Sequence, residues 1–385
     1  MRESCASDQA RRYLRLQMAE GIGPILARRL IDQFGSIDAV LNASPGELAG
    51  VEGIGHRRGR ALADARNDRA ADRELELAAR LGLRIVCLDD AEYPHPLRHI
   101  NDPPLCLYVR GRLDPQDAVG LAVVGSRKCT RYGAGQAERF GAALASAGFC
   151  VISGLARGVD GAALQAAVAA GGRSIAVLGN GLSTVYPPEH GELAMKIAAR
   201  GAVVSEVPLE SPPEATNFPH RNRIIAGLGL GVLVIEAAHR SGASITARLA
   251  SEYNREVFAV PGRVDTPTAH GVNALIRDGQ AKLVTCLQDI LDDLGDVGRL
   301  MAPAAADAEP DVAVDEAKRA MVVGGLTHQE QAVWRVLSAD AIHLDGIAGA
   351  ADLPIESVTA VLTRLQLRGL AEALPGDRFA RRNRG

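Results

Sequence analysis

The sequence predicts an α/β protein, with a doubly wound, largely parallel sheet between an N-terminal and a C-terminal helical region. Three observations support this fold class. Short apolar runs alternate with helical segments between residues 119 and 287, as in a parallel sheet that helices cover on both faces. Residues 1–82 carry Ala, Leu and Arg at amphipathic spacing, which favours helices. Residues 326–385 resume a helical pattern after an acidic stretch.

Length and composition limit the partners that the chain can bind. Its 385 residues suffice for two or three folded units, and a hydrophobic content of 47% is ordinary for a soluble protein. Aromatic residues make up only 3%, so we expect one or two ring contacts with a ligand and no broad stacking platform. The formal charge of −3 argues against a polyanionic partner when taken alone.

The acidic residues, however, are concentrated in one stretch. Between Asp289 and Glu316 there are nine acidic residues and a single basic one, Arg299. The remainder of the chain is mildly basic, so a local cationic groove is compatible with the composition. We expect residues 291–325 to form an acidic flexible linker.

The cysteines and the N-terminus indicate a cytoplasmic protein. The six cysteines are scattered without a C-x-x-C pair, which fits reduced thiols. The N-terminal residues have no apolar signal core, and no apolar run is long enough to span a membrane. His95 and His99 are four residues apart, but Pro96 disfavours a helical ligand pair, so we expect no metal site and no cofactor.

The N-terminal region contains a near-repeat. Gly21-Ile22-Gly23 recurs as Gly53-Ile54-Gly55, and each copy lies between two helical segments. This pattern predicts a SAM-like or helix-hairpin-helix domain over residues 1–82, in which the amides of Gly21, Gly23, Gly53 and Gly55 can face a phosphate. A purely structural or protein-docking module is equally compatible with the pattern.

The central region, residues 83–290, predicts a Rossmann-like domain. A short strand over 83–88 precedes a proline-rich passage. The runs LAVVG, CVISG, SIAVLG, AVVSE, GVLVIEA, EVFAVPG and KLVT then follow as strands. In such a sheet, ligands lie beyond the carboxyl ends of the strands. The glycine-rich turns after these strands are therefore the candidate site.

The first two turns offer backbone amides and arginines. Gly125, Ser126 and Arg127 follow the first strand of the alternating series, and Gly154, Arg157 and Gly158 follow the second. A turn before a helix N-terminus attracts an anion, and a guanidinium can hold a phosphate through two hydrogen bonds. Arg127 stands where a dinucleotide-binding motif would have its second glycine, which argues against a dinucleotide cofactor.

Two further segments add to this edge of the sheet. Phe218, Arg221 and Arg223 combine a ring with two cations at a helix start, which suits a base and a phosphate. The alternative is that Phe218 packs inward and Arg221 pairs with a carboxylate such as Glu206. Ser241, Gly242 and Ser244 lie at another helix N-terminus. No P-loop, catalytic triad or metal-ligand spacing is present, so we expect a binding protein and no enzyme.

Residues 326–385 predict a winged helix, with three helices and a hairpin that turns at Pro375-Gly376-Asp377. A recognition helix over 354–368 would contact DNA. Because that helix carries only Arg364 and Arg368 as basic residues, a protein-docking or regulatory role is the favoured alternative.

The motifs GSRKCTRYG, SGLARGVDGAA, FPHRNRIIAGLG, SGASITARLA and REVFAVPGR resemble the DNA-processing DprA (Smf) family over residues 90–285. The resemblance implies single-stranded DNA binding, loading of RecA onto incoming DNA in natural transformation, and homodimerisation through the Rossmann-like domain. It also implies single-strand-binding protein as a further partner. Many relatives carry a basic residue where this chain has Pro188.

The rival interpretation is a nucleotide hydrolase of the lysine-decarboxylase-like phosphoribohydrolase type. Those enzymes place glutamates shortly after a glycine-rich turn. Here the corresponding segment reads EAAHRSGASITARLA, in which the opening turns of the expected helix contain no carboxylate.

Overall fold

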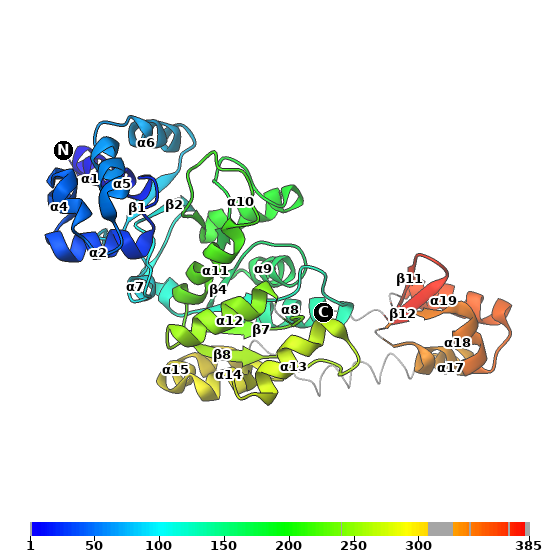
Figure 1. Cartoon of the computed structure of the whole chain (residues 1–385). Coiled ribbons are helices and arrows are strands. Elements are labelled where there is room, and N and C mark those ends of the chain that lie inside the picture. The colour runs from blue at the N-terminus through cyan, green and yellow to red at the C-terminus, as the bar shows by residue number, and fades with distance from the viewer. Residues whose placement is uncertain (1, 240, 307–325, 339, 369, 382–385) are drawn as a thin grey trace. The chain divides into compact units, whose positions relative to one another are not determined.

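The computed structural model (Figure 1) describes residues 2–239, 241–306, 326–338, 340–368 and 370–381. The chain divides into two units. The larger unit contains the N-terminal helices and a nine-stranded sheet, and the smaller unit contains a three-stranded sheet. In the described residues no helix has the length and apolarity needed to cross a membrane.

The N-terminal region is helical, as the sequence predicts. Its helices are α1 (Arg2–Gln17), α2 (Pro24–Phe34), α3 (Ile37–Asn42), α4 (Pro45–Ala49), α5 (Gly55–Ala65) and α6 (Ala70–Arg80). Gly21 and Gly53 adopt φ values of +75° and +86°, which only glycine tolerates easily. Both hairpins therefore depend on these glycines, and α2 and α5 start just after them.

A buried core joins these helices to the sheet. Leu14, Leu30 and Leu62 belong to the same hydrophobic cluster as Cys106 and Tyr108 of the sheet. Figure 1 shows the helices beside β1 and β2, and α1 contacts both of these strands. The N-terminal helices are thus packed on one edge of the sheet.

The central sheet has the order β1-β2-β6-β5-β4-β3-β7-β8-β9. Its strands are β1 (Arg84–Cys87), β2 (Cys106–Gly111), β3 (Gly120–Val124), β4 (Cys150–Ser153), β5 (Ser174–Leu178), β6 (Ala202–Ser205), β7 (Gly231–Val234), β8 (Glu256–Ala259) and β9 (Lys282–Leu283). The strands from β3 to β9 are parallel to one another, whereas β1–β2 and β2–β6 are antiparallel pairs. The predicted doubly wound sheet is therefore confirmed and extended at one edge.

The strand order reverses at β3, which pairs with β4 on one side and β7 on the other. At such a switch point the loops after two neighbouring strands run toward opposite faces of the sheet. This leaves a crevice for ligands at the carboxyl ends of the strands. The loops after β3, β4 and β7 meet here. The fold thus places the glycine-rich turns of the sequence at its expected binding edge.

Helices cover both faces of this sheet. The first face carries α8 (Arg131–Ser146), α9 (Val159–Ala169), α10 (Gly191–Arg200) and α14 (Leu287–Asp293). The second face carries α7 (His95–Arg98), α11 (Asn217–Leu228), α12 (Gly242–Glu252) and α13 (His270–Arg277). Because helices cover both faces, strands β3 to β7 are buried on both sides. Their sequences are therefore continuous apolar runs without alternation.

The expected flexible linker begins with a helix. Residues 295–306 form α15 (Gly295–Ala306), which corrects the linker prediction for this part. A Cβ at Gly298 would overlap the Leu291 carbonyl, and Met301 packs against the core of the larger unit. Packing against α14 therefore outweighs the polar composition that suggested a linker. The other part of that stretch, residues 307–325, lies outside the described residues.

The smaller unit has the predicted winged-helix elements. They are α17 (His328–Val336), β10 (Ile342–His343), α18 (Leu344–Ala351), α19 (Ile355–Leu367), β11 (Ala371–Leu374) and β12 (Arg378–Arg381), with strand order β10-β12-β11. Gly376 and Asp377 take positive φ at the turn between β11 and β12. The hairpin turn is thus at the predicted residues.

Both arginines of the expected recognition helix contact a buried acid. Glu330 of α17 is 1% exposed and lies 3.2 Å from Arg364 and 3.5 Å from Arg368. Its carboxylate also accepts a hydrogen bond of 2.8 Å from the Thr327 amide. Because Glu330 offsets their charge, the arginines of α19 present a weaker cationic surface to DNA than the sequence suggests, which favours the docking or regulatory alternative.

Replacing Glu330 with alanine is expected to lower the stability of the winged helix by about 1–3 kcal/mol, since two arginines and a helix cap lose their partner. The Thr327 amide lowers the pKa of Glu330. The contribution is therefore present above the pKa of an unfolded glutamate and is lost as pH falls through the lowered pKa. The chain has a single tryptophan, Trp334 of α17, so its fluorescence during urea unfolding measures this effect.

Candidate nucleic-acid interface

The loops after β3, β4 and β7 are in direct contact. The Ser126 amide donates to the Glu236 carbonyl over 2.7 Å, and the Val159 amide donates to the Ser126 carbonyl over 3.3 Å. A Cβ on Gly125 would lie 2.6 Å from the Val159 side chain, and one on Gly158 (φ +76°) would overlap the Ser126 carbonyl. These two glycines therefore let the turns pack directly against each other and form one continuous edge.

Arg127 is the central cation of this edge. Its side chain is exposed, and its guanidinium carbon lies 4.8 Å from the centre of the Phe218 ring. A guanidinium over a ring is attracted by the ring quadrupole and keeps its hydrogen-bond donors available at its edge. Arg127 and Phe218 thus form a charge-plus-ring combination, whereas the sequence analysis expected Arg221 and Arg223 to supply the cations beside this ring.

A second ring and a second arginine extend the pair. Tyr186, between β5 and α10, has its ring centre 5.9 Å from that of Phe218. Arg157 is half-exposed, and its Nε donates to Glu189 over 2.5 Å. We call Arg127, Arg157, Tyr186 and Phe218 the rim patch.

The ion pair between Arg157 and Glu189 is exposed, so another anion can take the place of the Glu189 carboxylate. Glu189 raises the pKa of Arg157, and Arg157 in turn lowers the pKa of Glu189. Both side chains are about half-exposed, and exposed ion pairs contribute little to stability. A phosphate can therefore replace the Glu189 carboxylate on Arg157 at small cost. Tyr186 and Glu189 were not among the predicted site residues, although the TVYPPEH segment lies on the predicted edge.

Arg221 lies beneath this patch, which corrects its expected contact with phosphate. It is 6% exposed, and its Nη1 donates to the carbonyl oxygens of Gly154 (2.7 Å) and Val177. Burial lowers the pKa of Arg221 to about 10, an effect that the nearby Asp160 carboxylate opposes. A Cβ on Gly154 would overlap the guanidinium. Arg221 therefore holds the ends of β4 and β5 together.

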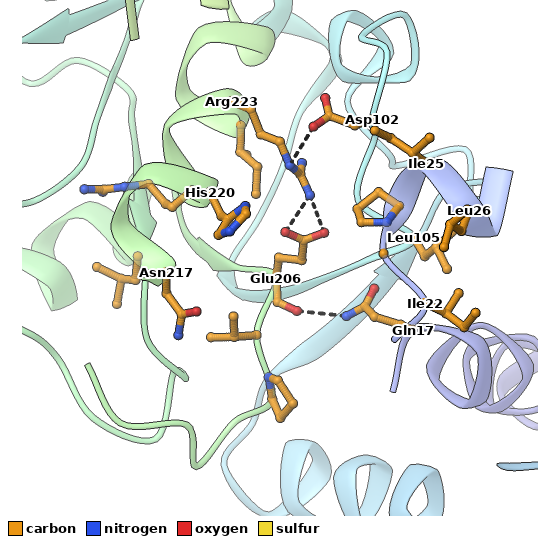
Figure 2. Close-up of a pocket in the computed structure, with 18 residues that line it drawn as sticks. Gln17, Ile22, Ile25, Leu26, Asp102, Leu105, Glu206, Asn217, His220 and Arg223 are labelled. Atoms are coloured by element: carbon orange, nitrogen blue, oxygen red, sulfur yellow. Dashed lines mark hydrogen bonds and ion pairs between the residues drawn. The ribbon is translucent and has the colours of Figure 1, made fainter. Parts of the chain in front are cut away.

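Arg223 is also turned inward, which corrects the second expected phosphate contact. Its Nη2 donates to both Glu206 oxygens over 2.5 and 2.6 Å, and its Nε lies 3.3 Å from Asp102 (Figure 2). The alternative of a buried arginine pairing with Glu206 is thus realised, but by Arg223 in place of Arg221. The two residues differ from Arg127 because they lie within α11, whose inner face packs on the sheet.

Ser241, Gly242 and Ser244 begin α12, beyond β7. The Ser241 hydroxyl accepts from the Ser244 amide over 3.3 Å and lies 3.1 Å from the Ser244 hydroxyl. This is an ordinary N-cap, which uses the hydroxyl groups locally. The exposed Gly242 backbone is the part of this turn that faces outward.

The hairpin glycines lie in the N-terminal helices. A hollow of about 810 Å³ is lined by Gly21 and Gly55 together with Arg57, Arg58 and Arg60. Arg57 pairs with Glu20 over 2.6 Å, and Arg58 donates to the Gly53 carbonyl over 2.5 Å. Gly53 and Gly23 shape the same hairpins, but Gly23 lines another cavity, beside the sheet. The first hairpin thus faces both hollows.

The two histidines of the proline-rich passage form a helical pair, which Pro96 was expected to disfavour. His95 and His99 have their Nε2 atoms 3.3 Å apart on and after α7. Pro96 permits this because it occupies the first turn of the helix, where its missing amide is not needed. Within the described residues, no group of three or more His, Cys, Asp or Glu is placed to hold a metal ion.

Comparisons with known proteins match the helical, the Rossmann-like and the winged-helix parts of the chain. The family model "DNA recombination-mediator protein A" matches residues 84–295, "DprA winged helix domain" matches 303–377, and "SAM-like Helix-hairpin-helix tandem" matches 13–68. Protein Smf of Synechocystis sp. is 35% identical, over 98% of this chain and 100% of that protein. Protein Smf of Escherichia coli is 41% identical, over 76% of each.

A solved structure shares the fold. The X-ray structure of DNA processing protein A (DprA) from Streptococcus pneumoniae superposes with a TM-score of 0.65 at 33% identity. It covers 73% of this chain and 97% of that chain.

Proposed function

Because this chain belongs to the DNA recombination-mediator protein A (DprA/Smf) family, we propose that it binds single-stranded DNA at the rim patch. One observation carries this proposal. Arg127 and Arg157 are exposed at the carboxyl edge of the sheet, beside the rings of Phe218 and Tyr186. Cations that hold the backbone and rings that stack on bases are the two elements of single-strand binding.

The composition of the patch sets the kind of recognition. Guanidinium groups bind phosphates, which are the same at every nucleotide, and rings stack on any base. Single strands expose their base faces, whereas a duplex buries them in the stack. The protein therefore prefers single strands to duplex DNA and has little sequence preference. The amides of Gly125, Gly158 and Gly242 supply further phosphate donors along the edge.

We further propose a finer role, which the family membership supports. The protein loads RecA onto incoming single strands and protects them during natural transformation. Its partners are RecA, single-strand-binding protein and a second copy of itself through the Rossmann-like domain, and it acts in the cytoplasm. The curated relatives support a DNA-processing role through their names, Protein Smf and DNA processing protein DprA.

The N-terminal hairpins add a second contact with the DNA backbone. Arg57, Arg58 and Arg60 surround the hollow next to Gly21 and Gly55, so cationic side chains accompany the hairpin amides. Protein docking is the alternative for this surface.

The position of Glu236 at the carboxyl edge of the sheet argues against the nucleotide-hydrolase interpretation. Glu236, at the end of β7, is 2% exposed, and a Cβ on Gly133 would lie 2.5 Å from its carboxyl carbon. The helix that follows, α12, opens with Gly-Ala-Ser-Ile. A general base must reach its substrate, and this buried carboxylate does not. Incubation with nucleoside monophosphates is expected to release no free base, and steady turnover would favour the hydrolase.

Filter binding of the full chain to a labelled 30-nucleotide strand and to the matching duplex tests the proposal. We expect tighter binding of the strand and a dissociation constant that rises steeply with salt, because each phosphate contact releases counterions. Equal affinity for the two forms, or affinity that is independent of salt, would contradict single-strand binding at a cationic edge.

A further inference from the structure

The proline-rich passage carries an exposed pair of imidazoles that none of the functions described above uses. His95 is the first residue of α7, and His99 directly follows its last residue. Both side chains are exposed. Their Nε2 atoms lie 3.3 Å apart, and their ring centres lie 4.6 Å apart. Because imidazole is the commonest metal ligand in proteins, this pair is a candidate metal site.

The spacing of the two nitrogens matches that of two ligands on one ion. Zinc binds imidazole nitrogen at about 2.0–2.1 Å with tetrahedral geometry, which places two such nitrogens about 3.3–3.4 Å apart. The Nε2 atoms of His95 and His99 are 3.3 Å apart. An ion therefore fits between these atoms with little change in their positions. The alternative is a simple hydrogen bond, in which one imidazole donates to the other.

The short helix that carries the histidines is firmly held. Leu97 is fully buried and Ile100 is 1% exposed. A Cβ on Gly227 of α11 would lie 2.7 Å from the Ile100 side chain, so α7 packs closely on α11. Arg255 also donates to the Pro96 carbonyl over 3.0 Å. The backbone that positions both ligands is thus organised in advance, which lowers the entropic cost of binding an ion.

The ligand set selects the class of ion. The two carboxylates that precede α7 have other partners. Asp90 accepts from the Cys87 amide over 2.7 Å and from the Gln9 side chain over 3.1 Å, and Glu92 pairs with Arg84. The pair therefore offers nitrogen ligands alone. Magnesium and calcium require oxygen ligands, whereas imidazole suits zinc and the transition metals next to it.

We propose that His95 and His99 bind one divalent transition-metal ion, with zinc as the best fit, through their Nε2 atoms. The ion joins the two ends of α7, and water fills its other positions, so the site stays open to a further ligand. The sequence analysis expected no metal site here, because it expected Pro96 to disfavour the helical pair. The inference is independent of DNA binding, since neither histidine belongs to the rim patch.

Isothermal titration of the full chain with zinc chloride, after treatment with a chelator, tests the site. His95→Gln and His99→Gln each remove one ligand at an exposed position. His328→Gln is the matched control, because His328 is also exposed but lies on α17 in the smaller unit. Cys129 and Cys286 are partly exposed thiols that can bind zinc as well. They are present in every variant, so the differences between variants report on the histidine pair.

We expect the wild type and His328→Gln to bind zinc alike. His95→Gln and His99→Gln should each weaken one site by at least about 10-fold, the lower end of the cost of changing even a residue that supports a metal ligand. Magnesium chloride should give no binding at this pair. Zinc should also raise the unfolding temperature of the wild type more than that of these two variants, because an ion that binds the folded state stabilises it.

Thermal unfolding without metal should be the same for all four proteins, since the substituted side chains are exposed. Zinc affinity that is unchanged in His95→Gln and His99→Gln would leave only the hydrogen bond between the imidazoles and would overturn the metal site. An equal loss in His328→Gln would do the same.

Discussion

Replacing Arg127 with alanine is expected to weaken binding of single-stranded DNA by about 5- to 150-fold, or about 1–3 kcal/mol, without lowering stability. The side chain is exposed and lies over Phe218, so its removal deletes a charged donor from the surface and leaves the core intact. Anisotropy titration gives the affinity, and urea unfolding followed by circular dichroism gives the stability.

Arg277→Ala is the matched control for this change. Arg277 is exposed and pairs with Asp278 at the end of α13, just before β9 begins and hence away from the carboxyl edge. The Arg277→Ala variant should leave the affinity for single-stranded DNA unchanged. Equal affinity of Arg127→Ala and the wild type would remove Arg127 from the binding site.

Replacing Arg221 with methionine, unlike Arg127→Ala, should lower the stability of the protein, with a loss of about 3–5 kcal/mol in the free energy of unfolding. The change leaves the carbonyl oxygens of Gly154 and Val177 without their donor and Asp160 without its neighbouring cation. DNA affinity should fall as well, because the turn after β4 loses its support. Urea unfolding followed by circular dichroism measures the stability.

Arg200→Met controls for the loss of an arginine that donates to a backbone carbonyl. Arg200 is exposed and donates to Gly171 over 2.8 Å, so its removal should cost far less. If Arg221→Met lost affinity but kept wild-type stability, Arg221 would contact the DNA directly, and its positioning role would be wrong.

Arg127 and Arg221 show what could and could not be predicted from the sequence. The pattern of strands and turns placed Arg127 and Arg221 correctly on the same edge, because the carboxyl ends of parallel strands share one side of a sheet. It could not tell which of them faces solvent. Arg127 lies in the loop before α8, whereas Arg221 lies on the buried face of α11. The direction of a side chain depends on tertiary packing.

Other differences have similar causes. The antiparallel strand β2 was not predicted, because the prolines before it obscured its apolar run. Helix α15 replaced part of an expected linker because α14 offers it a packing surface. Tyr186 was overlooked, since only the fold brings its ring beside Phe218. Periodicity and turn residues thus predicted the architecture, while long-range contacts decided the composition of the site.

The most direct test of the rim patch is the salt dependence of single-strand affinity in the double variant Arg127→Ala/Arg157→Ala. Each phosphate contact on a single strand contributes about 0.7 to the slope of the logarithm of affinity against the logarithm of salt concentration. If both arginines hold phosphates, the slope of the double variant should be shallower than that of the wild type by about 1.4. An identical slope for the two proteins would show that the strand binds elsewhere.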